Sequence, residues 1–162
     1  LPRLRAPAAG NRDAGLATLV VFLGVLFGRV LSAEDRAELR ERLDYTLAQE
    51  PERLEAYQVL AGHLEAGARR RHAADFATAD AAVQAQILEE LMNIRYNTRL
   101  ARLASRVSGA AARHYRMRSG TIPGLSWLYA NSGAQWRARG YTRWPGIPGD
   151  WREVLRPGNR AA

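Results

Sequence analysis

The chain of 162 residues contains neither cysteine nor lysine. Without cysteine it cannot hold disulfides, zinc–thiolate sites, iron–sulfur clusters or covalently attached c-type haem. All 24 basic residues are arginines, and with 16 acidic residues they give a formal net charge of +8. Because arginine pairs with carboxylates through two hydrogen bonds and stacks on aromatic rings, an all-arginine surface favours contact with other proteins.

The motifs of common catalytic and nucleotide-binding sites are also missing. The sequence has no glycine-rich phosphate loop, no Gly-x-Ser-x-Gly nucleophile motif and no His-Glu-x-x-His pair. The three histidines, His63, His72 and His114, lie far apart, which favours helix-surface or interface positions over metal ligation. We therefore expect a chain that is not an enzyme and that has no cofactor or metal of its own.

Two clusters of charge admit two interpretations each. Glu89 and Glu90 are adjacent, and a solvated helix face, paired with Arg99 or Arg102, is favoured over a catalytic acid pair. The arginine run at 69–71 lies between expected helices, where a solvated loop is favoured over a nucleic-acid patch. Neither cluster therefore defines a site by itself.

Apolar residues recur at helical spacing along most of the chain and predict an all-α fold. We expect about five helices in a compact bundle, including one over 33–49 that Ser32 caps with Asp35 three residues later. A second begins with Pro51 in its first turn and frays at Gly67, and two more span about 79–95 and 98–118.

The most apolar stretch covers residues 16–31 and includes Arg29. It is short for a membrane-spanning helix, which needs about 20 apolar residues. A buried core helix is therefore favoured, and a membrane-embedded segment is the alternative.

The expected organisation is a single domain with an arm at each end. Residues 1–12 hold proline, glycine and arginine without periodicity and predict an extended N-terminal arm, followed by a helical body over 13–119. From 120 to 162 the chain is rich in proline, glycine, tryptophan and arginine, which predicts an irregular, partner-wrapping C-terminal arm. The arm has room for one short helix, around 124–138.

Positive charge and tryptophan gather in the same C-terminal region. All four tryptophans lie in the last 36 residues, and from Arg113 onward nine arginines face two acids, whereas the first 112 residues hold fifteen arginines and fourteen acids. Tryptophan and arginine are enriched at binding hot spots. We expect the arm to lie on a partner protein, with packing of the tryptophans into the chain's own core as the alternative.

A basic nucleic-acid-binding helical module is the alternative function. The positive charge and the interleaved arginine and tryptophan residues permit phosphate contact and base stacking. Such proteins usually place their cations on a regular helix or sheet, however, whereas here they lie on a proline-broken segment. A protein partner is therefore favoured.

The arm also carries a recognisable order of residues. It reads Ser132-Gly-Ala-Gln-Trp136, then Gly140-Tyr141, then Pro145-Gly146. This S-x3-W-x3-G-Y-x3-P-G pattern resembles the C-terminal signature of the gluconate 2-dehydrogenase subunit 3 family, the small subunits of bacterial flavin-dependent sugar and alcohol dehydrogenases. The stretches LFGRVLSAEDRAELRERL and ILEELMNIRYNTRL are similar to the family's first helices and its mid-chain helix.

The resemblance implies a non-catalytic small subunit in a periplasmic electron-transfer complex. Its partner would be a large FAD-dependent subunit of the glucose-methanol-choline type, which the small subunit stabilises and helps to export. A multihaem cytochrome c commonly takes the electrons, so membrane association would be indirect. The start at Leu1 agrees with a leader that has been cleaved or is not shown. No nucleic acid is implied.

Transferred to this sequence, the resemblance places the C-terminal arm in the subunit interface. The expected interface residues are five aromatic anchors and three arginines that would form salt bridges: Trp127, Trp136, Tyr141, Trp144, Trp151, Arg137, Arg139 and Arg143.

Overall fold

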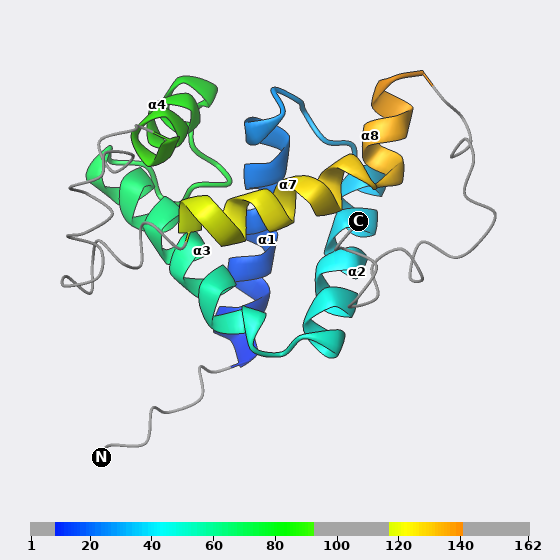
Figure 1. Ribbon diagram of the computed structural model, residues 1–162. Coiled ribbons are helices and arrows are strands. Elements are labelled where there is room, and N and C mark those ends of the chain that lie inside the picture. The colour runs from blue at the N-terminus through cyan, green and yellow to red at the C-terminus, as the bar shows by residue number, and fades with distance from the viewer. Residues whose placement is uncertain (1–8, 93–116, 141–162) are drawn as a thin grey trace, which may run out of the picture.

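The computed structural model describes residues 9–92 and 117–140, which form helices joined by turns and loops and contain no β-strand (Figure 1). The elements are α1 (Ala9–Leu26), α2 (Ala33–Gln49), α3 (Arg53–Arg70), α4 (Ala81–Met92), the π-helical η2 (Met117–Thr121), α7 (Ile122–Ala130) and α8 (Gly133–Ala138). The predicted all-α bundle is confirmed. Most of the fifth helix expected over 98–118 lies outside the described residues.

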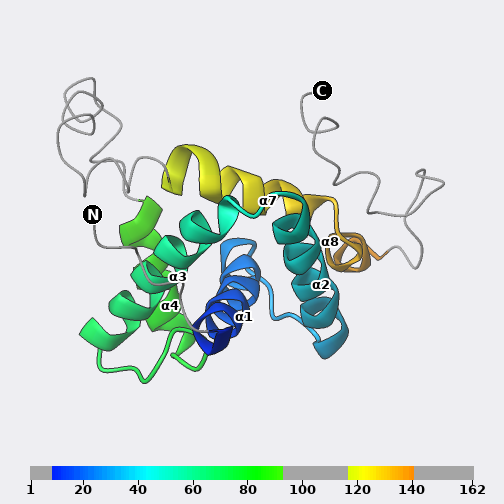
Figure 2. The same cartoon turned by 90° about the horizontal axis from the view of Figure 1, so that it is seen from below.

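Helix α1 is the centre of the bundle and contacts α2, α3, α4 and α7 (Figure 2). It buries Leu16, Leu19, Val20, Phe22 and Leu23, so apolar side chains cover more than one side of the helix. A helix with apolar side chains on several faces must pack against other elements on those faces. The core helix expected in 16–31 is therefore present, although it ends at Leu26. Within the described residues, no helix combines the length and apolarity required to cross a bilayer.

The extended arm expected for the first twelve residues is too long, because α1 already begins at Ala9. Two ion pairs tie the start of this helix to α2: Arg12 Nη2 lies 3.3 Å from Asp44 Oδ1, and Arg40 Nη2 lies 2.5 Å from Asp13 Oδ1. Charged partners on α2 thus extend the helix into a segment that lacks an apolar pattern of its own.

Helix α2 has the predicted start, end and buried face. The Ser32 hydroxyl accepts a hydrogen bond from the Asp35 N–H at 3.0 Å, and the Ser32 N–H donates to the Asp35 carboxylate at 3.3 Å. This reciprocal capping box stabilises a helix start by about 1 kcal/mol. Leu39, Leu43 and Leu47 are buried as predicted, so α2 turns its apolar stripe toward the core.

Helix α3 differs from its expected bounds at both ends. It begins at Arg53, after a turn that contains Pro51, and it continues to Arg70 instead of fraying at Gly67. Gly67 is buried, and a Cβ atom at this position would lie 3.0 Å from Ile87 Cγ2 on α4. The glycine therefore permits a close approach of α3 and α4.

The arginine run at 69–71 belongs to the end of α3 and is not a free loop. Arg70 and Arg71 form ion pairs with Glu90 of α4 at 3.4 and 2.9 Å. Cations in the last turn of a helix also interact favourably with its dipole. Glu90 thus helps to join α3 and α4, and the arginines expected as its partners lie outside the described residues.

The segment 120–140 is more regular than the arm that the sequence predicted, because two helices lie where one short helix around 124–138 was expected. After η2 it forms α7 and α8, and α7 crosses in front of α1 (Figure 1). The reason is an apolar pattern that proline and glycine obscured, since these elements bury Met117, Ile122, Leu125, Leu128, Tyr129 and Ala134. Pro123 lies in the first turn of α7, where its missing N–H does no harm. Residues 141–162 of the expected arm lie outside the described residues.

Candidate partner interface around helix α8

Helix α8 is short and has a defined end on each side. The Ser132 hydroxyl donates to the Tyr129 carbonyl at 2.6 Å and accepts from the Gln135 N–H at 3.3 Å, so it caps the start of the helix. Gly140 follows the last turn with a φ of 82°, which glycine adopts at little cost. The serine and the first glycine of the C-terminal signature therefore delimit this helix.

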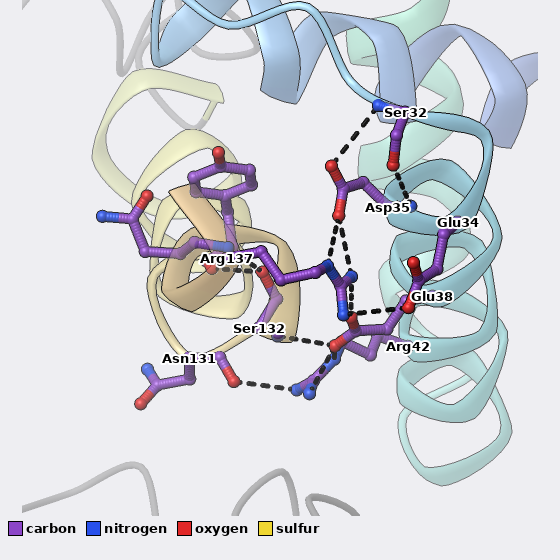
Figure 3. A network of polar contacts seen from close by, with 11 residues as sticks. Ser32, Glu34, Asp35, Glu38, Arg42, Asn131, Ser132 and Arg137 are labelled. Atoms are coloured by element: carbon purple, nitrogen blue, oxygen red, sulfur yellow. Dashed lines mark hydrogen bonds and ion pairs between the residues drawn. The ribbon is translucent and has the colours of Figure 1, made fainter. Parts of the chain in front are cut away.

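A network of charged side chains holds α8 against α2 (Figure 3). Arg137 of α8 reaches three acids of α2: its guanidinium lies 3.3 Å from Glu34, 2.7 Å from Asp35 and 2.7 Å from Glu38. One cation thus meets three carboxylates that are spaced along one helix.

Glu38 is the centre of this network. Its Oε1 atom accepts from the Gly133 N–H at 2.7 Å and from Arg42 Nε at 2.8 Å, and its Oε2 atom accepts from Arg137 at 2.7 Å. A Cβ atom on Gly133 would lie 2.6 Å from Glu38 Oε2. The glycine is therefore required for the carboxylate to approach the start of α8.

Arg42 supports the network from the core side. Its side chain is only 1% exposed, and its guanidinium donates to Glu38 and, at 3.0 Å, to the Asn131 carbonyl. A buried cation costs several kcal/mol unless its hydrogen bonds are made. The Asn131 carbonyl, in the link between α7 and α8, is therefore one of the acceptors that compensate for the burial of Arg42.

The network keeps its carboxylates ionised. Burial opposes ionisation of Glu38, but the Gly133 N–H and the guanidinium groups of Arg42 and Arg137 outweigh it and lower the pKa of Glu38. Burial likewise opposes ionisation of Asp35, and hydrogen bonds from Arg137 and Ser32 lower the pKa of this carboxyl. The attraction between α2 and α8 is therefore fully present at neutral pH.

Four of the eight expected interface residues lie in the described part of the chain. Trp127 on α7 and Trp136 on α8 are partly exposed, and Arg139 lies over the Trp136 ring with its guanidinium carbon 5.8 Å from the ring centroid. Arg137, expected to pair with a partner, uses its charge within the chain instead. The other four, Tyr141, Arg143, Trp144 and Trp151, lie outside the described residues.

Sequence reasoning did not identify Glu38, Arg42, Asn131 or Gly133 as members of this site. Glu38 and Arg42 are four residues apart on a helix, which is the spacing of an ordinary surface ion pair. Their partners lie about ninety residues further along the chain, in the link between α7 and α8 and on α8 itself. The sequence therefore shows the four-residue spacing of Glu38 and Arg42, but it does not show that they bind the start of α8 and the link before it.

The described residues also include two histidines and a cleft. They contain no group of three histidine, aspartate or glutamate side chains that could hold a metal ion. His63 is half-buried, and burial and the nearby Arg70 lower its pKa, whereas His72 is exposed at a φ of 61°. A cleft of about 510 Å³ lies beside α1 and α3, lined largely by small residues such as Gly15, Ala61 and Gly62.

The comparisons with known proteins give no relative: no family model matches the chain, and no curated protein or solved structure is significantly similar to it.

Proposed function

We propose that this chain is a non-catalytic helical subunit that binds a larger partner protein through α8 and the residues that follow it. The observation that carries the proposal is the way α8 is fixed. Three acids of α2 hold Arg137 of α8, while Trp136 is half-buried with its ring beneath the exposed Arg139. A rigid element that presents an aromatic ring and a cation binds with a small loss of conformational entropy.

The residues that follow α8 extend the same chemistry. Tyr141, Arg143 and Trp144 come directly after Gly140, and no acidic residue occurs between Glu90 and Asp150. Such a segment complements an acidic protein surface, because it carries positive charge and has no carboxylates that an acidic surface would repel.

The resemblance of this segment to gluconate 2-dehydrogenase subunit 3 leads us to propose the identity of the partner. It is a large FAD-dependent dehydrogenase subunit of the glucose-methanol-choline type in a periplasmic complex, with a multihaem cytochrome c as a further component. In this assignment the flavin and any haem belong to the partners, and this chain stabilises the large subunit.

The test is purification of the tagged full-length chain from its source organism, followed by native mass spectrometry and absorption spectroscopy. We expect a larger subunit with a flavin spectrum to accompany the chain. The double variant Trp136→Ala and Trp144→Ala should lose this subunit, whereas Gln86→Ala, at an exposed position of α4, should keep it. A colourless monomer in the wild type contradicts the proposal, and salt-dependent binding to mixed oligonucleotides would then favour the nucleic-acid alternative.

A further inference from the structure

The loop between α1 and α2 exposes apolar side chains close to α8. Val30 is 99% exposed and Phe27 is 37% exposed. A single exposed apolar residue is ordinary on a protein surface. Two of them on one short loop, beside partly exposed aromatic and cationic residues, match the composition of binding hot spots more closely.

Several contacts hold this loop in one conformation. The Arg29 N–H donates to the Gly24 carbonyl at 2.8 Å, and the Phe27 ring stacks on buried Tyr129 at 4.3 Å between centroids. Gly28 adopts a φ of 65°, and a Cβ atom on Gly24 would lie 2.8 Å from the Arg29 carbonyl oxygen. Val30 is therefore displayed by an ordered loop, and its binding requires little ordering.

A hydrogen bond joins the loop to α8. Arg29 Nη1 donates to the Ala138 carbonyl at 3.3 Å, which places the loop beside the end of the helix that carries Trp136 and Arg139. Within the described residues, neither Arg29 nor Arg139 forms an ion pair with a carboxylate. The loop–α8 surface, defined as Phe27, Arg29, Val30, Trp136 and Arg139, thus combines apolar groups with two cations that lack an acidic partner there.

We propose that the loop–α8 surface docks on a protein surface that offers an apolar pocket for Val30 with carboxylates beside it. This inference rests on the proposed function and deepens it, because it names the chemistry that the large subunit must present. It also adds the α1–α2 loop to an interface that the sequence placed in the C-terminal region alone.

Charge complementarity supports an acidic protein as the occupant. Residues 9–92 contain nine arginines and fourteen acids, whereas residues 117–140 contain three arginines and no acid. Arg137 is balanced by Glu34, Asp35 and Glu38, so the positive charge of the loop–α8 surface comes from Arg29 and Arg139. An acidic partner is attracted to these two cations. A bilayer is a poorer occupant, because burial of Val30 and part of Phe27 supplies only about 1.5–3 kcal/mol per side chain at most.

The first experiment uses a photoreactive benzoylphenylalanine at Val30 in the purified complex, with the same group at Ala85 on α4 as the matched control, since Ala85 is also exposed. We expect Val30 to cross-link to peptides of the flavin-containing subunit that are rich in aspartate and glutamate, and Ala85 to give no such product. An intact complex without a Val30 cross-link overturns this inference and leaves the proposed function standing. Absence of any complex overturns both.

The second experiment reverses the charges. The double variant Arg29→Glu and Arg139→Glu should weaken binding of the flavin-containing subunit at least tenfold, while Arg36→Glu, an exposed arginine on α2, should leave it within twofold. Circular dichroism melting of each free chain establishes that the variants fold. Equal affinities for the wild type and the double variant would overturn the inference. So would sedimentation of the wild type, but not of Val30→Asp, with phosphatidylglycerol vesicles, because the surface would then bind lipid.

Discussion

Two contacts between helices of this molecule are built by different means. Where α1 meets α3, a Cβ atom on Gly15 would lie 3.6 Å from the Cβ atom of Ala61. Both helices bury leucine side chains in this contact region. Where α2 meets α8, Arg137 and Glu38 join the helices, together with the Gly133 N–H. The first contact depends mainly on apolar burial, with one hydrogen bond from the Thr18 hydroxyl to the Glu65 carboxylate at 2.6 Å. The second depends on ionisation and on accurate hydrogen-bond geometry.

The difference separates the stable core from the candidate interface. Apolar packing around α1 does not change with pH, whereas the network around Glu38 needs charged carboxylates. Because Arg137 is engaged by α2, we propose that Arg139, Arg29 and the residues after Gly140 contact the partner. In this proposal the contact between α2 and α8 positions the interface residues and does not itself touch the partner.

The largest expected change in the free energy of unfolding comes from a substitution in the apolar core. Leu60 is completely buried in α3, so Leu60→Ala removes apolar contacts and leaves a cavity. We expect a loss of about 2–5 kcal/mol in the free energy of unfolding, of similar size at pH 7 and pH 4, measured by urea denaturation. A loss below about 1 kcal/mol would contradict the position of α3 in the core.

Arg42→Leu tests the buried cation of the polar contact. It removes donors from the half-buried residues Glu38 and Asn131. We expect a loss of about 3 kcal/mol, because leucine cannot replace the hydrogen bonds of Arg42 to Glu38 and to the Asn131 carbonyl. The control Arg36→Leu, at an exposed position of the same helix, should change stability by less than about 0.5 kcal/mol. Equal effects of the two variants would contradict a special role of Arg42.

Two glycine substitutions compare the close approach at α8 with an open position on α3. Gly133→Ala forces the Glu38 carboxylate away from the start of α8 and should cost about 1–3 kcal/mol. Gly62→Ala meets no atom within 4 Å and should stabilise α3 by about 0.5–1 kcal/mol. Thermal unfolding of both variants measures the difference, and stabilisation by Gly133→Ala would show that Glu38 does not need this approach.

A smaller effect is expected from pH. The folded chain lowers the pKa values of Asp35 and Glu38 below their ordinary values of 3.8 and 4.5. These groups therefore stabilise the fold above their unfolded pKa values, and the contribution is lost as the pH falls through the lower folded values. Wild-type stability should begin to fall near pH 4.5 and continue to fall below pH 3.8.

The variant Glu38→Gln isolates the contribution of Glu38 to the pH dependence of the unfolding free energy. Because glutamine does not titrate, the unfolding free energy of this variant should decrease less than that of the wild type over the same pH range. Glu90, which Arg71 holds in its ionised form with a lowered pKa, contributes equally to both proteins. Parallel stability curves for the two proteins would contradict the assignment to Glu38.

The fold was predictable where local chemistry determines it. The capping box of Ser32 and the stripe of Leu39, Leu43 and Leu47 lie within one helix, and the structure has both. Helix α8 carries a similar local signal, since Ser132 and Gly140 delimit it, but the surrounding prolines and glycines favoured an irregular segment. The network around Glu38 could not be predicted, because it joins residues about ninety-five or more positions apart.

Hydrogen exchange at a single neutral pH tests the central claim, that charged contacts hold α8 in position. Arg137→Met keeps the aliphatic stem and removes the cation that reaches Glu34, Asp35 and Glu38. We expect about tenfold weaker protection of the α8 amides, which corresponds to about 1.4 kcal/mol, with unchanged protection in α3. Unchanged α8 protection, or an equal loss in α3, would contradict the claim.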